Sequence, residues 1–302
     1  MKREFIKAQV SDFIKPEEFG IFYHIITNST ISAGLSSGGW IAGGFARAIL
    51  TGESIIDYLY TEGERGNTGD IDIFFPNQEA AAGAMSSLES ITRQQVKLQP
   101  NRFAIDWHLQ PNNNMWEFFE KNIPMYNKRA GVRVQFVVNP PDGFKTTLLD
   151  TINNFDLVNC MVGIEGQYIY FPAEWQVLEE SKSLKIAKSD TPFLGQRLSK
   201  YLLSRGYKNI EESSRDLFIE WVARVHNDEF PSVFNSEHFR KEMMMSSFDK
   251  LIEREAIPLT DIVLLVNKWN ISKKQSTGNY GPSTYVTLDW ALEKLQNHVN
   301  VT

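Results

Sequence analysis

Residues 40–50, WIAGGFARAIL, place two glycines between an apolar run typical of a strand and an apolar run typical of a helix. A strand that turns through glycine into a helix predicts a mixed α and β architecture. Gly43 and Gly44 let the backbone come close to a triphosphate, whose oxygens can accept bonds from N–H groups at the start of the helix. Arg47 follows three residues past Gly44, where it could reach a phosphate or brace nearby aspartates; the alternative is a surface arginine.

The segment DIDIFFP (70–76) alternates strictly before a proline, which predicts a strand. Successive side chains of a strand point to opposite faces, so Asp70 and Asp72 share one face while the two isoleucines point into the core. Neighbouring carboxylates repel each other unless a cation lies between them. Mg²⁺ prefers hard oxygen ligands and keeps positions for water and phosphate, so the pair predicts a magnesium site. The simpler alternative is an exposed strand with two solvated aspartates.

A two-metal site of this kind, with ions about 3.5–4 Å apart, needs a third carboxylate. Asp156, in NNFDLVNCMVGI, begins a predicted apolar strand, where a charge is unexpected unless it has a partner or a function. Asp106, inside the apolar run FAIDWHL, is the alternative. We favour Asp156.

The other patterns predict a mixed first half and a helical second half. Amphipathic spacing predicts one or two helices within residues 4–26, and SAGLSSGG (32–39) predicts a loop. Strands are expected at 102–109, 132–138, 155–164 and 167–171, helices at 77–91 and 143–154, and a loop at 272–284. From about residue 173 onward the patterns are mainly helical. The predicted fold class is α+β: a mixed β-sheet flanked by helices (domain 1–174), followed by a mainly helical domain (175–302).

The composition excludes several classes of protein. A net charge of −6 argues against a uniformly basic nucleic-acid-binding surface, and the single Cys160 excludes an intramolecular disulfide. The N-terminus lacks the apolar core of a signal peptide, and no run approaches the ~18 apolar residues that predict a transmembrane helix. We therefore expect a soluble, cytoplasmic protein with no membrane partner. The five histidines form no metal-binding pattern, so no zinc site is expected, and no P-loop sequence occurs.

Taken together, IAGGFARAIL, GDIDIFF and FDLVNC resemble the motifs of the DNA polymerase β-like nucleotidyltransferase superfamily. That superfamily includes tRNA CCA-adding enzymes, poly(A) polymerases and small-molecule nucleotidyltransferases. The chain looks closest to stand-alone members encoded by bacteriophages and large DNA viruses, and the resemblance covers about residues 38–165.

The resemblance implies two divalent metal ions, Mg²⁺ or Mn²⁺, and transfer of a nucleoside monophosphate from an NTP such as ATP to an acceptor. By position, Gly43 and Gly44 would hold the triphosphate and Asp70 and Asp72 would bind both metals. Asp156 would bind the catalytic metal and act on the acceptor hydroxyl.

A basic segment follows in the second half. Between Lys182 and Lys208 there are seven basic residues and one acidic residue, Asp190. Within it Arg197 and Lys200 lie on one face of a predicted helix, where they could bind the triphosphate. The alternatives are a landing patch for an RNA or DNA acceptor and a solvated basic face.

The leading functional prediction is a metal-dependent nucleotidyltransferase. The acceptor can be an RNA 3′ end, a small molecule, a protein side chain or a second nucleotide. One alternative is a catalytically silent nucleotidyltransferase fold that serves as a binding or structural component of a phage. Another is a toxin or defence-related enzyme that has the same chemistry and a different acceptor.

Overall fold

The computed structural model of the chain describes residues 3–60, 69–92, 115–120, 132–138, 140, 143–191 and 194–226. The chain divides into two compact units. The first comprises Met1–Phe155 and Asn159–Gln176, and the second comprises Asp156–Val158 and Val177–Thr302. The domain boundary that composition predicts, between residues 174 and 175, stays a prediction.

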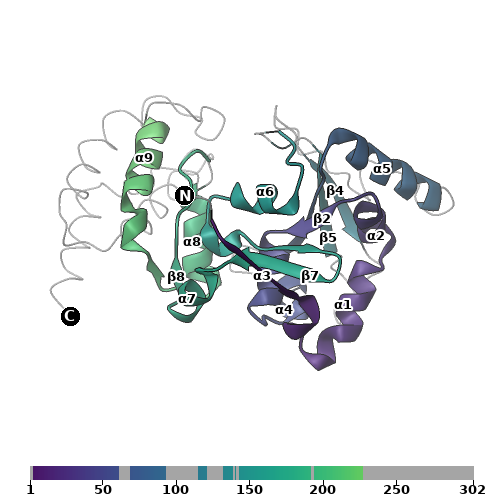
Figure 1. Cartoon of the computed structure of the whole chain (residues 1–302), viewed down its shortest axis with the longest axis horizontal. Coiled ribbons are helices and arrows are strands. Elements are labelled where there is room, and N and C mark those ends of the chain that lie inside the picture. The colour runs from purple at the N-terminus through teal and green to yellow at the C-terminus, as the bar shows by residue number, and fades with distance from the viewer. Residues whose placement is uncertain are drawn as a thin grey trace, which may run out of the picture. The chain divides into compact units, whose positions relative to one another are not determined.

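Among its described residues, the first unit contains a seven-stranded mixed sheet (Figure 1). Its strands, in spatial order, are β1 (Phe5–Gln9), β7 (Tyr168–Pro172), β6 (Gly163–Glu165), β2 (Trp40–Ala42), β3 (Asp70–Phe74), β5 (Val132–Val137) and β4 (Met115–Glu120). β3 and β5 run parallel, whereas the other neighbouring pairs are antiparallel. β3 therefore lies inside the sheet, with a hydrogen-bonded strand on each side.

The two faces of the central strands differ in polarity. Both isoleucines of β3 are fully buried, whereas Asp70 and Asp72 on the opposite face are partly exposed. The parallel register aligns Asp70 with Arg133 and Asp72 with Gln135 on β5, and these two side chains are also partly exposed. One face is thus apolar, and the other carries charged and amide groups.

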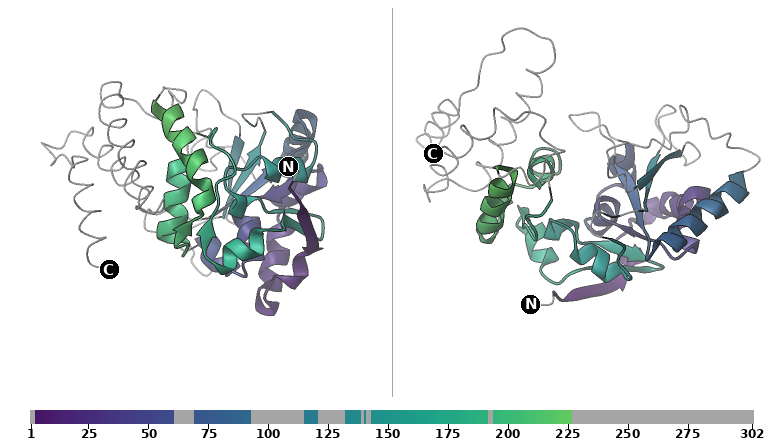
Figure 2. Two further views of the ribbon diagram at one scale, coloured as in Figure 1. Left: turned by 60° about the vertical axis from the view of Figure 1, so that its left-hand side comes forward. Right: turned by 90° about the horizontal axis from the view of Figure 1, so that it is seen from above.

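Helices pack on both faces of the sheet. The α-helices of the first unit, among the described residues, are α1 (Phe19–Ile26), α2 (Ser29–Ser36), α3 (Gly44–Leu50), α4 (Ile55–Tyr60), α5 (Gln78–Thr92) and α6 (Leu148–Asn153) (Figures 1 and 2). Helices α2 and α3 pack on the apolar face, whereas α6 packs on the opposite face, because a Cβ at Gly163 of β6, which is aligned with Ala42, would meet Leu148 and Ile152. α2 lies close to the sheet because Gly34 has no side chain; a Cβ there would come within 3.1 Å of atoms of Ile73 and Phe136. α3 and α4 contribute Phe45 and Leu59 to the same core.

Short 3₁₀ segments join some of these elements. They are η1 (Val10–Asp12), η2 (Pro16–Glu18), η3 (Val158–Cys160) and η4 (Glu212–Ser214). Glu18, at the end of η2, accepts hydrogen bonds from the Ser54 hydroxyl at 2.8 Å and the Ile55 amide at 3.0 Å. This carboxylate therefore satisfies an amide at the start of α4 that has no partner within the helix.

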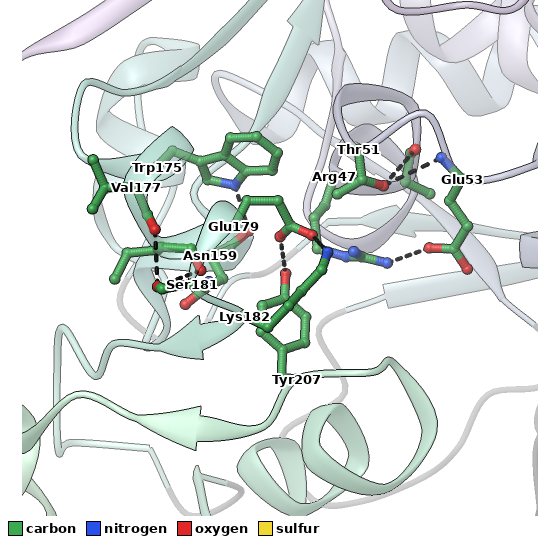
Figure 3. Close-up of polar contacts among 12 residues, drawn as sticks. Arg47, Thr51, Glu53, Asn159, Trp175, Val177, Glu179, Ser181, Lys182 and Tyr207 are labelled. Carbon is green, nitrogen blue, oxygen red and sulfur yellow. Dashed lines mark hydrogen bonds and ion pairs between the residues drawn. The ribbon is translucent and has the colours of Figure 1, made fainter.

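The described part of the second unit contains helices and a short parallel strand pair. Its described elements are β8 (Ser183–Leu184), α8 (Leu194–Ser204), β9 (Asn209–Ile210) and α9 (Arg215–His226); α7 (Trp175–Glu180) spans the division between the units. Gly195 lets α8 approach Trp221 of α9, because a Cβ at that position would lie 2.7 Å from the indole ring. The Tyr207 hydroxyl donates to the Glu179 carboxylate at 2.6 Å (Figure 3). This hydrogen bond joins α7 to the segment that leads into β9.

The predicted fold class is confirmed: a mixed sheet flanked by helices comes first, and the described part of the second unit is mainly helical. The strands predicted around 70–76, 132–138 and 167–171 occur, as do the helices within 77–91 and 143–154. The predicted strand at 102–109, the alternative Asp106 and the predicted loop at 272–284 lie outside the described residues.

Of the one or two helices predicted within residues 4–26, one occurs, α1, whereas residues 5–9 form strand β1 because they pair with β7 far along the chain. Two local predictions are wrong. SAGLSSGG is mostly helical, since α2 runs to Ser36 with its start capped by the Asn28 side chain, which accepts from the Thr30 amide at 2.9 Å. The strand predicted over 155–164 is confined to β6, and Asp156 lies in an irregular segment instead of beginning a strand.

Candidate active site

The carboxylates of β3 form the centre of the candidate site. Asp70 and Asp72 lie on the same face of the strand, as the alternation of burial shows. Arg133 is aligned with Asp70 in the register, so one cationic residue stands on the neighbouring strand at the level of the two acidic ones. Asp70, Asp72 and Arg133 together keep a formal negative charge, so this strand face suits a bound cation better than a bound anion.

The turn at Gly43 borders this pair. Gly43 has φ +88° and ψ −136°, a backbone conformation that residues other than glycine rarely adopt. Its amide donates to the Val162 carbonyl at 2.9 Å, which fixes the turn against the chain before β6. A Cβ at Gly43 would lie 3.7 Å from Oδ2 of Asp72, so any larger residue would occupy the space in front of that carboxylate.

This arrangement fits a hard divalent cation in donor type. Asp70 and Asp72 offer carboxylate oxygens on a partly exposed strand face, and Gly43 leaves room beside one of them. Within the part of the chain that the structure describes, no group of three or more His, Cys, Asp or Glu side chains is arranged to hold a metal ion. The described site therefore offers two carboxylates, and its remaining ligands would be water or substrate oxygens.

Tyr58 holds the start of β3 in place. Its carbonyl accepts from the Gly69 amide at 3.0 Å, and its hydroxyl donates to the Asp70 carbonyl at 3.4 Å. A Cβ at Gly44 would overlap that hydroxyl, and a Cβ at Gly69 would overlap the Tyr58 backbone. Gly44 and Gly69 are thus required for packing, whereas Gly43 is the glycine that faces the carboxylates.

Arg47 is buried and paired. Its side chain is 3% exposed, and Nη2 lies 2.5 Å from Oε2 of Glu53 (Figure 3). The amide of Arg47 donates to the Gly43 carbonyl at 2.9 Å, so this residue belongs to the first turn of α3, as the sequence predicts. The predicted contact of Arg47 with a phosphate stays a prediction.

Asp156 belongs to the second unit, where it is a buried acid with a cationic partner. Its side chain is 4% exposed, and Oδ1 accepts from Nη1 of Arg197 at 2.7 Å. Its other oxygen, Oδ2, is buried without a hydrogen-bond partner among the described residues. The backbone is fixed as well, because the Ala187 amide donates to the Asp156 carbonyl at 2.7 Å.

The predicted basic helix occurs as α8. Leu194, Leu198 and Tyr201 are buried, and Arg197 and Lys200 are exposed on the remaining surface of the helix. The structure therefore joins Arg197 to Asp156 within the second unit. The predicted triphosphate contacts of Arg197 and Lys200, and the role of Asp156 as third metal ligand, stay predictions.

Sequence reasoning missed three residues at the carboxylate site. Arg133 and Gln135 are aligned with the two aspartates, and Phe155 lies beside Gly43. The alternation in VRVQFVV carried the signal for the first two, because its polar positions mark the exposed face of a strand. Phe155 gave no comparable signal, since an aromatic residue before an apolar run reads as core.

A family model described as "Gad2: Gabija anti-defense 2 family protein" matches residues 7–180, which is more than half of the chain. The chain belongs to this family. The Gad2 match includes both aspartates of β3, the turn at Gly43 and Asp156. No curated protein sequence matches the chain.

Several solved structures are similar to the chain at low identity. A CCA-adding enzyme with ATP has a TM-score of 0.48 and 12% identity, with 100% of this chain and 70% of that chain covered. A CCA-adding enzyme with CTP gives 0.47 and 13%, covering 99% and 71%. The Thermotoga maritima CCA-adding enzyme complexed with tRNA gives 0.44 and 13%, covering 98% and 70%. Similarity at this level carries no assignment of the site, which therefore rests on the geometry of this chain alone.

None of the described helices combines the length and apolar character needed to cross a membrane.

Proposed function

We propose that the chain is a metal-dependent nucleotidyltransferase that moves a nucleoside monophosphate from an NTP to an acceptor hydroxyl. The observation that carries this proposal is the pairing of Asp70 and Asp72 on one strand face beside the turn at Gly43, where a Cβ would lie 3.7 Å from Asp72 Oδ2. Two carboxylates beside a side-chain-free backbone form a site where a cation and a polyphosphate can meet. The sequence motifs that surround these residues support the same reaction class.

In this proposal Asp70 and Asp72 hold Mg²⁺ or Mn²⁺ through their carboxylate oxygens. The bound ions would supply charge neutralisation for the triphosphate and lower the pKa of the attacking hydroxyl. Gly43, together with Gly44, lets the backbone approach the phosphates, since no Cβ fills the space next to Asp72. The acceptor oxygen forms a bond to the α-phosphorus, the bond from that phosphorus to its bridging oxygen breaks, and pyrophosphate leaves.

The other assigned residues keep their predicted roles within the proposal. Asp156 is the predicted third ligand and proton acceptor, and Arg47, Arg197 and Lys200 are the predicted phosphate contacts. The nature of the acceptor, whether RNA 3′ end, small molecule or protein, and the cytoplasm as the place of action also belong to the proposal.

A label-transfer assay tests the proposed reaction. The purified chain is incubated with each α-labelled NTP, Mg²⁺ or Mn²⁺, and RNA, protein and small-molecule acceptors. We expect labelled product and pyrophosphate, with a loss of at least about 100-fold when Asp70→Asn and Asp72→Asn are combined, as expected when a site loses a key electrostatic group. Asp57→Asn, an exposed carboxylate of α4, is the matched control. Transfer that persists in the double variant would refute the site.

A second candidate is favoured by the family description, which names an anti-defense role against Gabija. The chain could counter that defence by binding alone, with the nucleotidyltransferase fold serving as a silent scaffold. The double variant Asp70→Asn/Asp72→Asn separates the two candidates in a Gabija defence assay. Loss of the anti-defense effect supports the enzyme, and full retention supports the binding protein.

A further inference from the structure

The side chain of Phe155 lies at the edge of the carboxylate site. The position that a Cβ would take at Gly43 is 3.7 Å from Cε2 and 4.0 Å from Cζ of this ring, and 3.7 Å from Oδ2 of Asp72. The space over Gly43 is therefore bordered by an aromatic ring and by a carboxylate. Both groups belong to the first unit.

The ring is held in position by its neighbours. The Phe155 amide donates to the Ile152 carbonyl at 3.1 Å, which fixes the backbone at the end of α6. α6 itself is anchored on the sheet, because Ile152 is fully buried and packs near Gly163 of β6. The Phe155 ring contacts the ring of Phe74, with centroids 5.6 Å apart and planes inclined by 51°.

Neither ring belongs to the buried core. Phe74 and Phe155 are only partly buried, although Ile73 and Phe75, which flank Phe74 in the chain, are 0% and 1% exposed. The rings thus form a half-covered apolar surface next to a charged pair. A ligand that satisfies both surfaces must have an anionic end that binds cations and a flat apolar part a short distance away.

We propose that Phe155, supported by Phe74, forms the subsite for the nucleoside part of the NTP. This inference rests on the proposed function and adds to it the residue that distinguishes a nucleotide from a bare polyphosphate. The sugar or the base would lie against the ring while the polyphosphate lies at Asp70 and Asp72. Stacking of a nucleobase on an aromatic side chain is sequence-tolerant, so this subsite accepts more than one base.

The test is calorimetric titration of the full chain with Mg²⁺ and each of the four NTPs, and separately with Mg²⁺ and tripolyphosphate. Phe155→Ala should weaken NTP binding by about tenfold or more, the scale of one lost stacking contact, and change tripolyphosphate binding less than about twofold. Phe155→Tyr should bind NTPs as the natural chain does. Phe13→Ala is the matched control, since Phe13 is a half-buried ring with an aromatic partner, Phe171, at 6.1 Å.

If Phe155→Ala does not fold, Phe155→Leu keeps an apolar side chain and removes only the aromatic face. An equal penalty for all four NTPs assigns the ring to the sugar, and a larger penalty for purines assigns it to the base; both results support the subsite. Equal losses for NTP and tripolyphosphate, or no loss for either, would overturn it. NTP binding that depends on Phe155 and not on Asp70 and Asp72 would instead refute the proposed metal site, and absence of NTP binding by the natural chain would refute both.

Discussion

Gly43 is the residue on which the geometry of the site most depends. Its φ of +88° is strained for any residue with a Cβ, and its missing side chain leaves space beside Asp72. The two properties are separable, because conformational strain lowers stability wherever it occurs, whereas blocking the space in front of a carboxylate affects function only at this position.

Gly43→Ala should therefore lose both stability and function. We expect a decrease of about 1–3 kcal/mol in the free energy of unfolding, measured by urea denaturation, together with loss of Mg²⁺-dependent NTP binding. Gly166→Ala is the control: Gly166 also has positive φ, +58°, with nothing near its Cβ position. It should lose about 1–2 kcal/mol and bind NTP normally. Normal NTP binding by Gly43→Ala would show that the space beside Asp72 is not used.

Single residues of the site were predictable where the signal is local. Alternation alone places Asp70 and Asp72 on one face, and the two glycines between strand and helix predict the turn. The burial of Arg47 against Glu53 could not be predicted, because an arginine in the first turn of a helix is normally exposed. Likewise the position of Phe155 beside Gly43 depends on contacts between segments more than 100 residues apart.

Helices α3 and α4 meet where Gly44 faces Tyr58. A Cβ at Gly44 would overlap the Tyr58 hydroxyl, while the next atom, Cζ, would lie at 3.4 Å, an ordinary contact. Gly44→Ala should therefore destabilise the chain by about 1–3 kcal/mol, as overpacking does. Adding Tyr58→Phe removes the overlapping atom and should restore most of that loss in urea denaturation.

The control for this pair is Tyr58→Phe alone, which loses one long hydrogen bond to the Asp70 carbonyl and should cost about 0.5–1.5 kcal/mol. Additive losses in the double variant would show that the two residues do not compete for the same space.

The contact between α8 and Asp156 should respond asymmetrically to mutation. Arg197→Met leaves a buried carboxylate without its partner, and since Arg197 is 48% exposed we expect a moderate loss of about 1–3 kcal/mol. Asp156→Asn leaves a partly exposed arginine that water can solvate, so its loss should be smaller. Lys200→Met, at an exposed position of the same helix, should change the unfolding free energy little. Equal losses of unfolding free energy for Arg197→Met and Asp156→Asn would contradict the view that the buried Asp156 carboxylate depends on Arg197 for its stability.

Elements were predictable when their own pattern determined them. β3 and α5 carry clear strand and helix periodicity, and both occur. β1 was missed because its strand conformation depends on pairing with β7. The paired residues, such as Phe5 and Pro172, are separated by most of the first unit's sequence. α2 was missed because glycine and serine favour loops, whereas in the fold Gly34 provides close packing on the sheet.

For the molecule as a whole, the order of a mixed sheet followed by a mainly helical unit could be predicted, because mixed strand and helix patterns give way to mainly helical ones at about residue 173. The composition gave no sign that residues 156–158 group with the later helices, although their neighbours on both sides belong to the first unit. Phe155 belongs to the first unit, whereas Asp156, the next residue, belongs to the second unit and has its ionic partner, Arg197, on α8. The sequence motif FDLVNC contains both residues and does not show that they belong to different units.

The claim that Asp70 and Asp72 act as one metal-binding pair beside Gly43 is tested most directly by Mn²⁺ binding. Electron paramagnetic resonance of the full chain, titrated with Mn²⁺ in the presence of NTP, measures the affinity and the number of bound ions. Saturable binding that is lost in Asp70→Asn/Asp72→Asn and kept in Asp57→Asn is the predicted result. Equal Mn²⁺ affinity in the natural chain and the double variant would contradict it.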